Sequence, residues 1–199
     1  TNAGATWSAS NTGLPGGAAA LSGLSKDGTV FFVSLDKQGI YHSVDNGANW
    51  SLWGNTATRS ETAFPRGVSR DSSAPGKYYL ATLEGVYKTL DDGLTWTTSK
   101  MGNGRVAAVI HDISNQSIAY LATATVVKIS DIYASSQDAT LIDSGITGTT
   151  NDGVTAQDPA NANVLYATTN NRGIFKSVNG GASWSAINAG LPSLVGQSS

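Results

Sequence analysis

The sequence predicts an all-β protein assembled from repeated four-stranded sheets. Short runs of β-branched and aromatic residues alternate with turns rich in Gly, Asn and Ser, and no segment keeps a 3.6-residue apolar period. Of the 199 residues 23 are Gly, only two are Glu, and 40% are apolar. This composition favours strands and turns over helices and is sufficient for a buried core.

A twelve-residue motif recurs three times without gaps. Each copy begins with Gly, continues through a short apolar run, and closes with the pattern Ser/Thr-x-Asp/Asn-x-Gly-x-x-Trp. A half copy, residues 2–7, opens the chain. Recurrence of this kind indicates a repeat architecture. The three full copies are residues 39–50, 85–96 and 173–184.

The interval between the copies matches one blade of a β-propeller. Trp50 and Trp96 are 46 residues apart, and Trp96 and Trp184 are 88 apart, which is twice 44. A worn copy, residues 125–142, fills the expected middle position but has lost the Gly and the Trp. A period of 40–45 residues with four strands is the sequence signature of a propeller blade. We therefore predict one domain, residues 1–199, with about four blades at 16–55, 62–101, 104–144 and 152–192.

Four short antiparallel strands are expected in every blade. In the first blade a turn at 26–28 separates strands one and two, and a tight hairpin at 36–39 separates strands two and three. The apolar second strand returns in the later blades at 78–82, 118–122 and 164–168. The four strands of the first blade are expected at 18–25, 29–34, 40–44 and 50–53.

The N-terminal half copy predicts one extra strand. Residues 7–10 are equivalent to residues 184–188, which already supply the fourth strand of the last blade, and both are followed by Gly-Leu-Pro. In a closed ring of four blades the two segments would have to occupy the same strand position. We therefore expect an incomplete ring within a longer natural propeller, or chains that self-associate through open blade edges.

The recurring motif has a mechanical interpretation. The Asp or Asn side chain accepts backbone N–H groups of the loop that follows it, and the hydroxyl ties the incoming strand. The Gly supplies a positive φ, and the Trp packs under the loop. The residues to which we assign this structural role are Asn2, Gly4, Trp7, Ser43, Asp45, Gly47, Trp50, Thr89, Asp91, Gly93, Trp96, Ser177, Asn179, Gly181 and Trp184.

The motif resembles the Asp-box, or bacterial neuraminidase repeat. That repeat occurs in sialidases, in xyloglucan-cleaving glycosidases, in sortilin-type receptors and in photosystem assembly factors. The resemblance covers essentially the whole chain and implies a β-propeller. In that family the boxes lie away from the active site, so the resemblance implies a structural role for them and says little about activity.

Two carboxylates are candidate catalytic groups. Residues 31–41 are similar in length and layout to the hairpin that carries a catalytic Asp in xyloglucan-cleaving enzymes, and this resemblance implies that Asp36 is an acid or base. A glycosidase needs a pair of carboxylates, and Glu84 is the nearest partner by blade order. The family has Gly-Gly after its Asp where this chain has Lys37 and Gln38. The alternative is that both carboxylates are solvated turn residues.

Other chemistry finds little support in the sequence. There is no Cys, the two His are isolated, and we expect no cofactor and no metal site. The net charge is −2, without a basic run or an apolar stretch of 18 residues, so neither nucleic acid nor a membrane span is expected. Arg59, Arg66 and Arg70 form a local cluster that fits an anion or a solvated face.

These observations leave two hypotheses for the function. The first is a secreted or extracellular, non-enzymatic binding or scaffold propeller that presents blade-face loops to a glycan or protein partner. The second is part of a glycoside hydrolase that cleaves xyloglucan or a related β-glucan, with Asp36 and Glu84 as the carboxylates. The sequence leaves open whether the chain is an enzyme, and it does not name the ligand.

Overall fold

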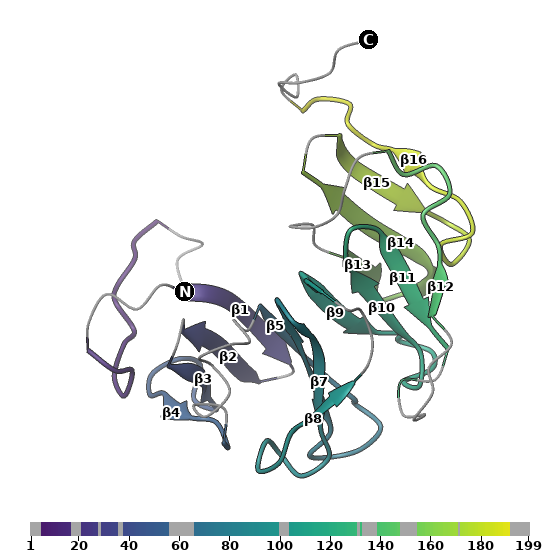
Figure 1. Cartoon of the computed structure of the whole chain (residues 1–199). Coiled ribbons are helices and arrows are strands. Elements are labelled where there is room, and N and C mark those ends of the chain that lie inside the picture. The colour runs from purple at the N-terminus through teal and green to yellow at the C-terminus, as the bar shows by residue number, and fades with distance from the viewer. Residues whose placement is uncertain are drawn as a thin grey trace.

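The structure, a computed structural model, consists of four antiparallel sheets of four strands each. Figure 1 shows the sheets side by side along an open arc, with the first strand of each sheet on the inner side. The all-β, four-bladed prediction is confirmed, and the first and fourth sheets do not meet to close a ring. The described residues are 5–16, 21–27, 29–35, 38–55, 66–99, 104–130, 132, 139–147, 155–170 and 172–191.

Within each sheet the strands pair in the order in which they follow along the chain. We call the four sheets blades one to four. Blade one contains β1 (Leu21–Asp27), β2 (Val30–Leu35), β3 (Gly39–Ser43) and β4 (Ser51–Leu52). Blade two contains β5 (Gly67–Arg70), β6 (Tyr78–Thr82), β7 (Gly85–Thr89) and β8 (Thr97–Ser99). Blade three contains β9 (Ala108–His111), β10 (Ala119–Ala122), β11 (Val126–Ile129) and β12 (Ala139–Leu141). Blade four contains β13 (Thr155–Asp158), β14 (Asn161–Thr169), β15 (Gly173–Ser177) and β16 (Ser185–Ala186).

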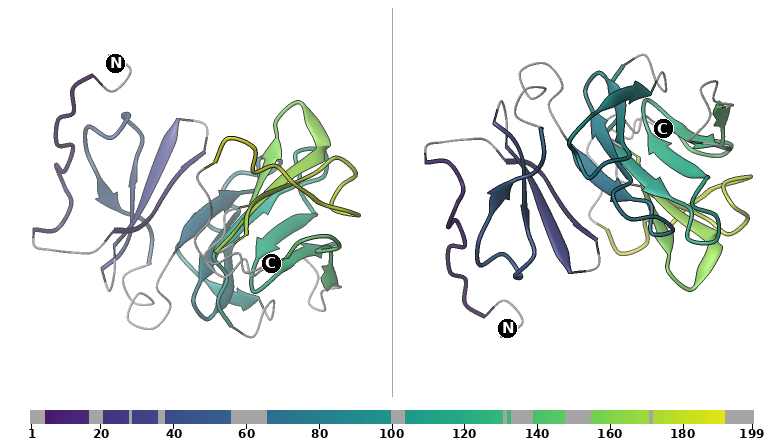
Figure 2. Two further views of the ribbon diagram at one scale, coloured as in Figure 1. Left: turned by 90° about the horizontal axis from the view of Figure 1, so that it is seen from above. Right: turned by 90° about the horizontal axis from the view of Figure 1, so that it is seen from below.

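The second strands of blades two and three are the most deeply buried elements. All five residues of β6 and all four of β10 are buried, because each of these strands has another blade on one or both of its faces. A continuous apolar run is the sequence pattern of such a strand. The two views of Figure 2 show the sheets stacked face against face rather than spread in one plane.

The hydrophobic core lies between the blades. Its largest aromatic contact joins blades one and two, where Trp53 is 3% exposed and its ring meets the rings of Phe32, Tyr78 and Trp96 edge-on. The ring centroids lie 4.9, 4.8 and 5.3 Å from Trp53, the separation at which edge-to-face aromatic pairs are favourable. Similar clusters join blades two and three and blades three and four. Each blade therefore depends on its neighbour for its core.

The loops between the third and fourth strands share one hydrogen-bond pattern. We call residues 43–50, 89–96 and 177–184 the tryptophan turns. In the first, Ser43 Oγ donates to Asp45 Oδ1 at 2.7 Å and accepts the Gly47 N–H at 2.8 Å. The Asn49 N–H donates to Asp45 Oδ1 at 2.9 Å. The other two turns repeat these bonds, and Gly47, Gly93 and Gly181 have φ angles of +86°, +85° and +89°.

These bonds hold the turn carboxylates in the ionised form. Hydrogen bonds from the Asn49 backbone, the Asn49 side chain and Ser43 lower the pKa of Asp45 to about 2. The hydroxyl and backbone N–H of Thr95 lower the pKa of Asp91 in the same way. Asn179 takes the equivalent place in blade four and donates from Nδ2 to Ser183 Oγ at 2.9 Å. The turns thus use their Asp and Asn residues as fixed acceptors.

A second contact joins the tryptophan turns of blades one and four to the segment that precedes each of them in the arc. The Trp184 N–H donates to Ser144 O at 2.9 Å, and its indole Nε1 donates to Ile142 O. Gly145 lies so close that a Cβ there would be 2.5 Å from Trp184 O. Ile142 packs on Gly181 from below the turn. The segment that follows β12 in blade three therefore packs against the tryptophan turn of blade four.

The expected N-terminal strand at residues 7–10 is wrong. No described strand pairs with these residues, and they run as an irregular segment alongside blade one. The segment is held by its carbonyl groups, because Trp50 donates from N to Thr12 O and from Nε1 to Ser10 O, both at 2.8 Å. Trp7 is 91% exposed, so it does not pack under a loop as expected. Asn2 and Gly4 lie outside the described residues.

Candidate functional site

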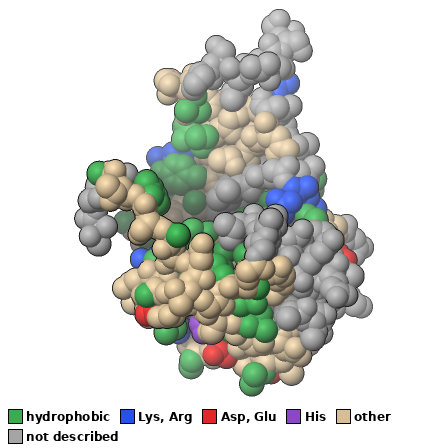
Figure 3. Space-filling model, turned by 90° about the vertical axis from the view of Figure 1, so that its left-hand side faces the viewer, with side chains coloured by type: hydrophobic (Ala, Val, Ile, Leu, Met, Phe, Trp, Pro, Cys, Tyr) green, Lys and Arg blue, Asp and Glu red, His purple; other side chains and the backbone are tan. Residues whose placement is uncertain are grey.

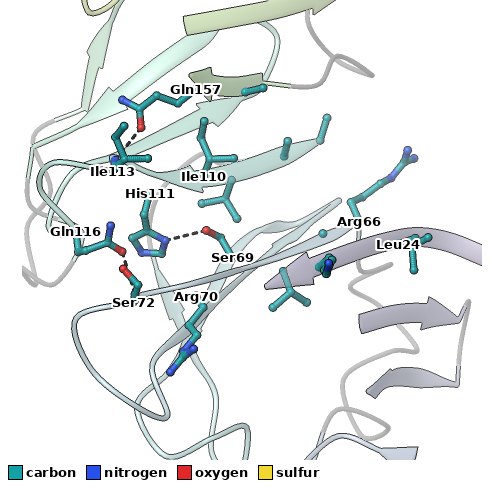
Figure 4. Close-up of a pocket in the computed structure, with 17 residues that line it drawn as sticks. Leu24, Arg66, Ser69, Arg70, Ser72, Ile110, His111, Ile113, Gln116 and Gln157 are labelled. Carbon is teal, nitrogen blue, oxygen red and sulfur yellow. Dashed lines mark hydrogen bonds between the residues drawn. The ribbon is translucent and has the colours of Figure 1, made fainter. Parts of the chain in front are cut away.

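A groove of about 560 Å³ follows the innermost strands of the arc. Leu24 of β1, Val68 of β5, Val109 of β9 and Ala156 of β13 all contribute to its lining, so every blade supplies part of it. The close-up in Figure 4 shows these strands converging around the groove. The groove exists because first strands from four repeats meet on the inner side of one arc.

Cationic side chains gather in this groove. Arg66 directly precedes β5 and Arg70 ends it (Figure 4). Lys26 of β1 also lines the groove. Among the described residues no carboxylate lines the groove. Figure 3 looks onto the open side of the arc, where Lys and Arg side chains border the hollowed middle. The charged side chains of the described lining are therefore all cationic, in a chain whose net charge is −2.

A further arginine strengthens the positive charge near Arg66. Burial lowers the pKa of Arg105, and the nearby Arg66 guanidinium lowers it further by repulsion between like charges. Arg66 and Arg105 therefore carry like charges near one another. A guanidinium can bind a carboxylate or a sulfate with two hydrogen bonds, because its planar fork matches both groups.

Polar side chains on the wall of the groove bridge adjacent blades. Ser69 Oγ of blade two lies 2.8 Å from His111 Nδ1 of blade three. The Ser72 N–H donates to Gln116 Oε1 at 3.0 Å, and the Ile113 N–H donates to Gln157 Oε1 at 2.8 Å. Figure 4 shows all three contacts on the same wall. They fix the blades relative to one another, so the groove is formed before any ligand arrives.

Behind this wall, Asp112 links blades three and four. It is 4% exposed and accepts the Tyr120 hydroxyl at 2.8 Å and Gln157 Nε2 at 3.0 Å, with further bonds from Ser114. Burial alone would raise its pKa, but the bonds from Ser114, Tyr120 and Gln157 outweigh burial and lower the pKa to about 2. Burial and the Asp112 carboxylate raise the pKa of Tyr120. Asp112 is therefore a permanently ionised structural acceptor.

The apolar part of the lining is aliphatic. Leu24 is 72% exposed and Ile113 is 44% exposed, and both reach the groove. No Trp, Tyr or Phe among the described residues lines it. A sugar bound here would rest on aliphatic surface and hydrogen-bond to cations, hydroxyls and amides, without an aromatic platform.

Glu84, one of the two predicted catalytic carboxylates, does not line this groove. Glu84 lies in the turn between β6 and β7, is exposed, and accepts the Tyr87 hydroxyl at 3.3 Å. Asp36 lies outside the described residues, so its pairing with Glu84 stays a prediction. Of the predicted arginine cluster, Arg66 and Arg70 reach the groove, whereas Arg59 also lies outside the described residues.

Four groove residues share one repeat position that sequence reasoning missed. An Asp lies at or directly after the end of each first strand. In every blade the residue just before this Asp lines the groove. Aligning the first strands, in addition to the tryptophan motif, would have revealed this position. It is occupied by Lys26, Arg70, His111 and Gln157.

Comparison with known proteins establishes the fold class. No protein-family model and no curated protein matches the sequence. Among solved structures, the chain is similar to an ancestral GH74 enzyme, with a TM-score of 0.68 and 22% identity over 87% of this chain and 24% of that one. It is also similar to the GH74 xyloglucanase from Xanthomonas campestris, with a TM-score of 0.62 and 16% identity over 89% of this chain and 31% of that one.

A third solved structure with the same architecture is YCF48 from Cyanidioschyzon merolae. It has a TM-score of 0.56 and 16% identity over 84% of this chain and 56% of that chain. This chain therefore spans about a quarter to just over half of the structures it matches. At these identities the likeness shows the fold, which is a β-propeller arc. Among the described residues no helix is long and apolar enough to cross a membrane, and no three His, Asp or Glu cluster to hold a metal ion.

Proposed function

We propose that this chain is an extracellular, non-enzymatic binding propeller whose inner groove holds an acidic glycan. The observation that carries the proposal is the charge of the groove, in which Lys26, Arg66 and Arg70 line the surface and no described carboxylate does. Carboxylate or sulfate groups along a glycan would meet cations at both ends of β5. The volume of about 560 Å³ lies within the range of ligand sites, roughly 300–1,000 Å³.

Several features support an acidic glycan over other ligands. A neutral glucan would gain most from aromatic stacking, which the described lining does not offer. A protein partner would gain most from aromatic anchors, and no aromatic residue belongs to the described lining of this groove. A xyloglucanase among the solved structures of this fold adds an analogy, since that enzyme acts on a polysaccharide.

The described carboxylates support a binding role rather than hydrolysis. Glycosidases hold an acid and a base roughly 5–9.5 Å apart across the scissile bond. Asp45, Asp91 and Asp112 are engaged in fixed hydrogen bonds that keep their pKa values low, so they are poor general acids. Glu84 stands on an exposed turn away from the groove.

A glycoside hydrolase segment is the second candidate function. It is favoured by the likeness to GH74 enzymes, which extends over more than four fifths of this chain. In this case Asp36 and Glu84 would act as the two carboxylates, and the remainder of the site would lie on further propeller surface. The two candidates differ in one observable, which is turnover.

Binding of defined polymers tests the proposal. The full chain is titrated with heparin, polygalacturonate, neutral xyloglucan and polyglutamate, and the dissociation constants are measured by calorimetry at two salt concentrations. We expect the acidic glycans to bind, and to bind more weakly at high salt. Arg66→Gln and Arg70→Gln should each weaken binding about 10- to 100-fold, the effect of losing a charge-assisted hydrogen bond of about 1.5–3 kcal/mol.

Arg172→Gln is the matched control. Arg172 lies in the turn between β14 and β15 and does not line the groove, so its loss should leave the affinity unchanged. If polyglutamate were the only polymer to bind, the partner would be an acidic protein rather than a glycan. Hydrolysis of xyloglucan that disappears in Asp36→Asn would establish the glycosidase instead. Equal loss of affinity in Arg172→Gln would remove the groove as the site, and detection of the protein only inside its source cells would contradict an extracellular role.

A further inference from the structure

The end of blade four repeats the N-terminal segment almost residue for residue. Residues 7–15 and 184–192 share the sequence Trp-Ser-Ala-x-Asn-x-Gly-Leu-Pro, which makes seven of nine positions identical. The two segments also share a turn. The Leu14 N–H donates to Asn11 O and the Leu191 N–H donates to Asn188 O, both at 3.0 Å. Gly13 and Gly190 have φ angles of +89° and +83°.

The first of these segments is already seated on blade one. Thr12 O accepts the Trp50 N–H, Ser10 O accepts the Trp50 indole, and Ser10 Oγ donates to Gly47 O. Gly13 presses on the Trp50 carbonyl so closely that a Cβ would lie 2.0 Å from its oxygen. Two of the three hydrogen bonds use backbone carbonyls of the segment, so its side chains contribute little to the fit.

The same seat occurs again between blades three and four, with a different side chain. Ile142 and Ser144 there use their carbonyls on Trp184 as Ser10 and Thr12 do on Trp50, and the Ile146 N–H closes the same turn on Asp143 O at 2.8 Å. Ile142 stands where Ser10 stands. The seat therefore accepts an Ile, which is the residue that blade four carries at position 187.

Among the described residues, nothing makes such a contact with the copy on blade four. A Cβ at Gly190 would meet nothing within 4 Å, and Ile187 and Leu191 are 41% and 42% exposed. Within one molecule this segment cannot reach the tryptophan turn of blade one, because the first and fourth blades stand at the two ends of an open arc (Figure 1). A second copy of the chain carries the matching surface.

We propose that residues 187–191 of one molecule dock on the tryptophan turn of blade one, residues 43–50, of a second molecule, in the place that residues 10–14 hold. The N-terminal segment is then a displaceable cap on that seat. Being part of the same chain, the cap acts at a high effective concentration, so the uncapped form is the minor one. The contact joins two different surfaces, and such a head-to-tail interface propagates into rings or filaments. This inference is independent of the proposed glycan site.

Removing the cap tests the inference. Gly13→Val should unseat the segment, since the Cβ would collide with Trp50 O and the φ of +89° disfavours Val. We expect the variant to self-associate at a concentration at least tenfold lower than the wild-type chain in sedimentation velocity. The double variant Gly13→Val/Gly190→Val should be monomeric, because residues 187–191 can then no longer dock on the exposed turn.

Gly16→Val is the matched control for the cap. A Cβ at Gly16 meets nothing within 4 Å and Gly16 has no positive φ, so this variant should sediment as the wild type does. A folded Gly13→Val chain that stays monomeric at wild-type concentrations would overturn the inference, as would association that survives Gly190→Val. A synthetic peptide of residues 184–192 gives a second measurement on the wild-type chain. It should bind and displace the cap, whereas the same peptide with Gly190→Val should not, and equal binding or no binding of both peptides would also overturn the inference.

Discussion

Trp7 and Trp184 begin nearly identical nine-residue segments but end in opposite environments. Trp184 is 5% exposed and its indole donates to Ile142 O, whereas Trp7 is 91% exposed. The local turn that follows each of them is the same. The difference lies in what stands beside them, since Trp184 packs in the cluster between blades three and four, whereas Trp7 is almost fully exposed. Burial in this molecule is supplied by the neighbouring repeat, as in other repeat proteins.

The other two tryptophans of the motif complete a graded series. Trp96 is 5% exposed and packs on Trp53 of the preceding blade. Trp50 is only half-buried, because the segment that precedes it is the short N-terminal cap rather than a full blade. The four positions thus carry one residue type in three environments. Substitutions at these positions and at the turns that contact them should separate what the motif contributes from what its neighbour contributes.

The largest effect is expected at Trp184. Trp184→Ala removes a buried indole from the core between blades three and four, and should lower the free energy of unfolding by about 3–5 kcal/mol. Trp96→Ala should have a similar effect, since Trp96 is equally buried. Urea unfolding followed by far-UV circular dichroism measures both. A loss below about 1 kcal/mol at either position would contradict the graded series, because a loss that small is typical of a surface substitution.

The next effect compares one turn in two places. Gly145 is seated against Trp184 O at φ +93°, whereas Gly190 has a similar φ of +83° and a Cβ there would meet none of the described atoms within 4 Å. Gly145→Ala combines backbone strain with a collision and should cost about 2–4 kcal/mol, whereas Gly190→Ala should cost about 1 kcal/mol from strain alone. The urea midpoints of the two variants measure the difference, provided that the free energy of unfolding depends on urea concentration with the same slope in both. Equal costs would show that the blade contact adds nothing to the turn.

Blade three offers a third comparison, because it has no tryptophan turn and is tied to blade four by Asp112. Asp112→Asn should lower the free energy of unfolding by about 1–3 kcal/mol, since buried donors lose a charged acceptor. The pKa of Asp112 is about 2 in the folded chain and 3.8 ordinarily, so its stabilisation is complete above the ordinary value and is lost as the pH falls towards 2. Asp45 and Asp91 act in the same direction.

Acid unfolding between pH 4 and pH 2 measures this contribution. The wild-type chain should lose stability across the window, and Asp112→Asn should lose less of its remaining stability than the wild type does. Asp143→Asn is a suitable control, because Asp143 lies in the same pair of blades and is only half-buried. If Asp112→Asn lost as much stability between pH 4 and pH 2 as the wild type does, ionisation of Asp112 would not be the cause of the acid sensitivity.

The sequence was sufficient for the fold because its information is local and repeated. Strand runs, hairpin turns and the interval between Trp50, Trp96 and Trp184 together specify four four-stranded sheets. The error at residues 7–10 has a physical cause: a fourth strand forms only when a third strand lies beside it, and local sequence does not report that neighbour. Trp7 looked equivalent to Trp184 for the same reason.

The groove was harder to predict because its lining comes from residues about 44 apart in the chain. Lys26, Arg70, His111 and Gln157 differ in chemistry, so no motif marks them, although they occupy one position of the repeat. Arg66 and Arg70 were noticed as neighbours in sequence, and the structure adds Lys26 and the absence of carboxylates from the described lining. A charge pattern becomes a site only once the fold has brought the first strands together.

The smallest effect, and the sharpest test of the comparison, is expected at Trp7. Trp7→Ala removes the same side chain from the same local sequence as Trp184→Ala, yet it should change the free energy of unfolding by less than about 0.5 kcal/mol, because the exposed indole of Trp7 makes little contact. The seat on Trp50 uses the carbonyls of Ser10 and Thr12, which this substitution leaves in place. Intrinsic fluorescence should lose a solvent-exposed, red-shifted component without a change in the urea midpoint. A Trp7→Ala chain destabilised as strongly as Trp184→Ala would mean that Trp7 is buried in solution, and the arc would then have to close over its own N-terminal segment.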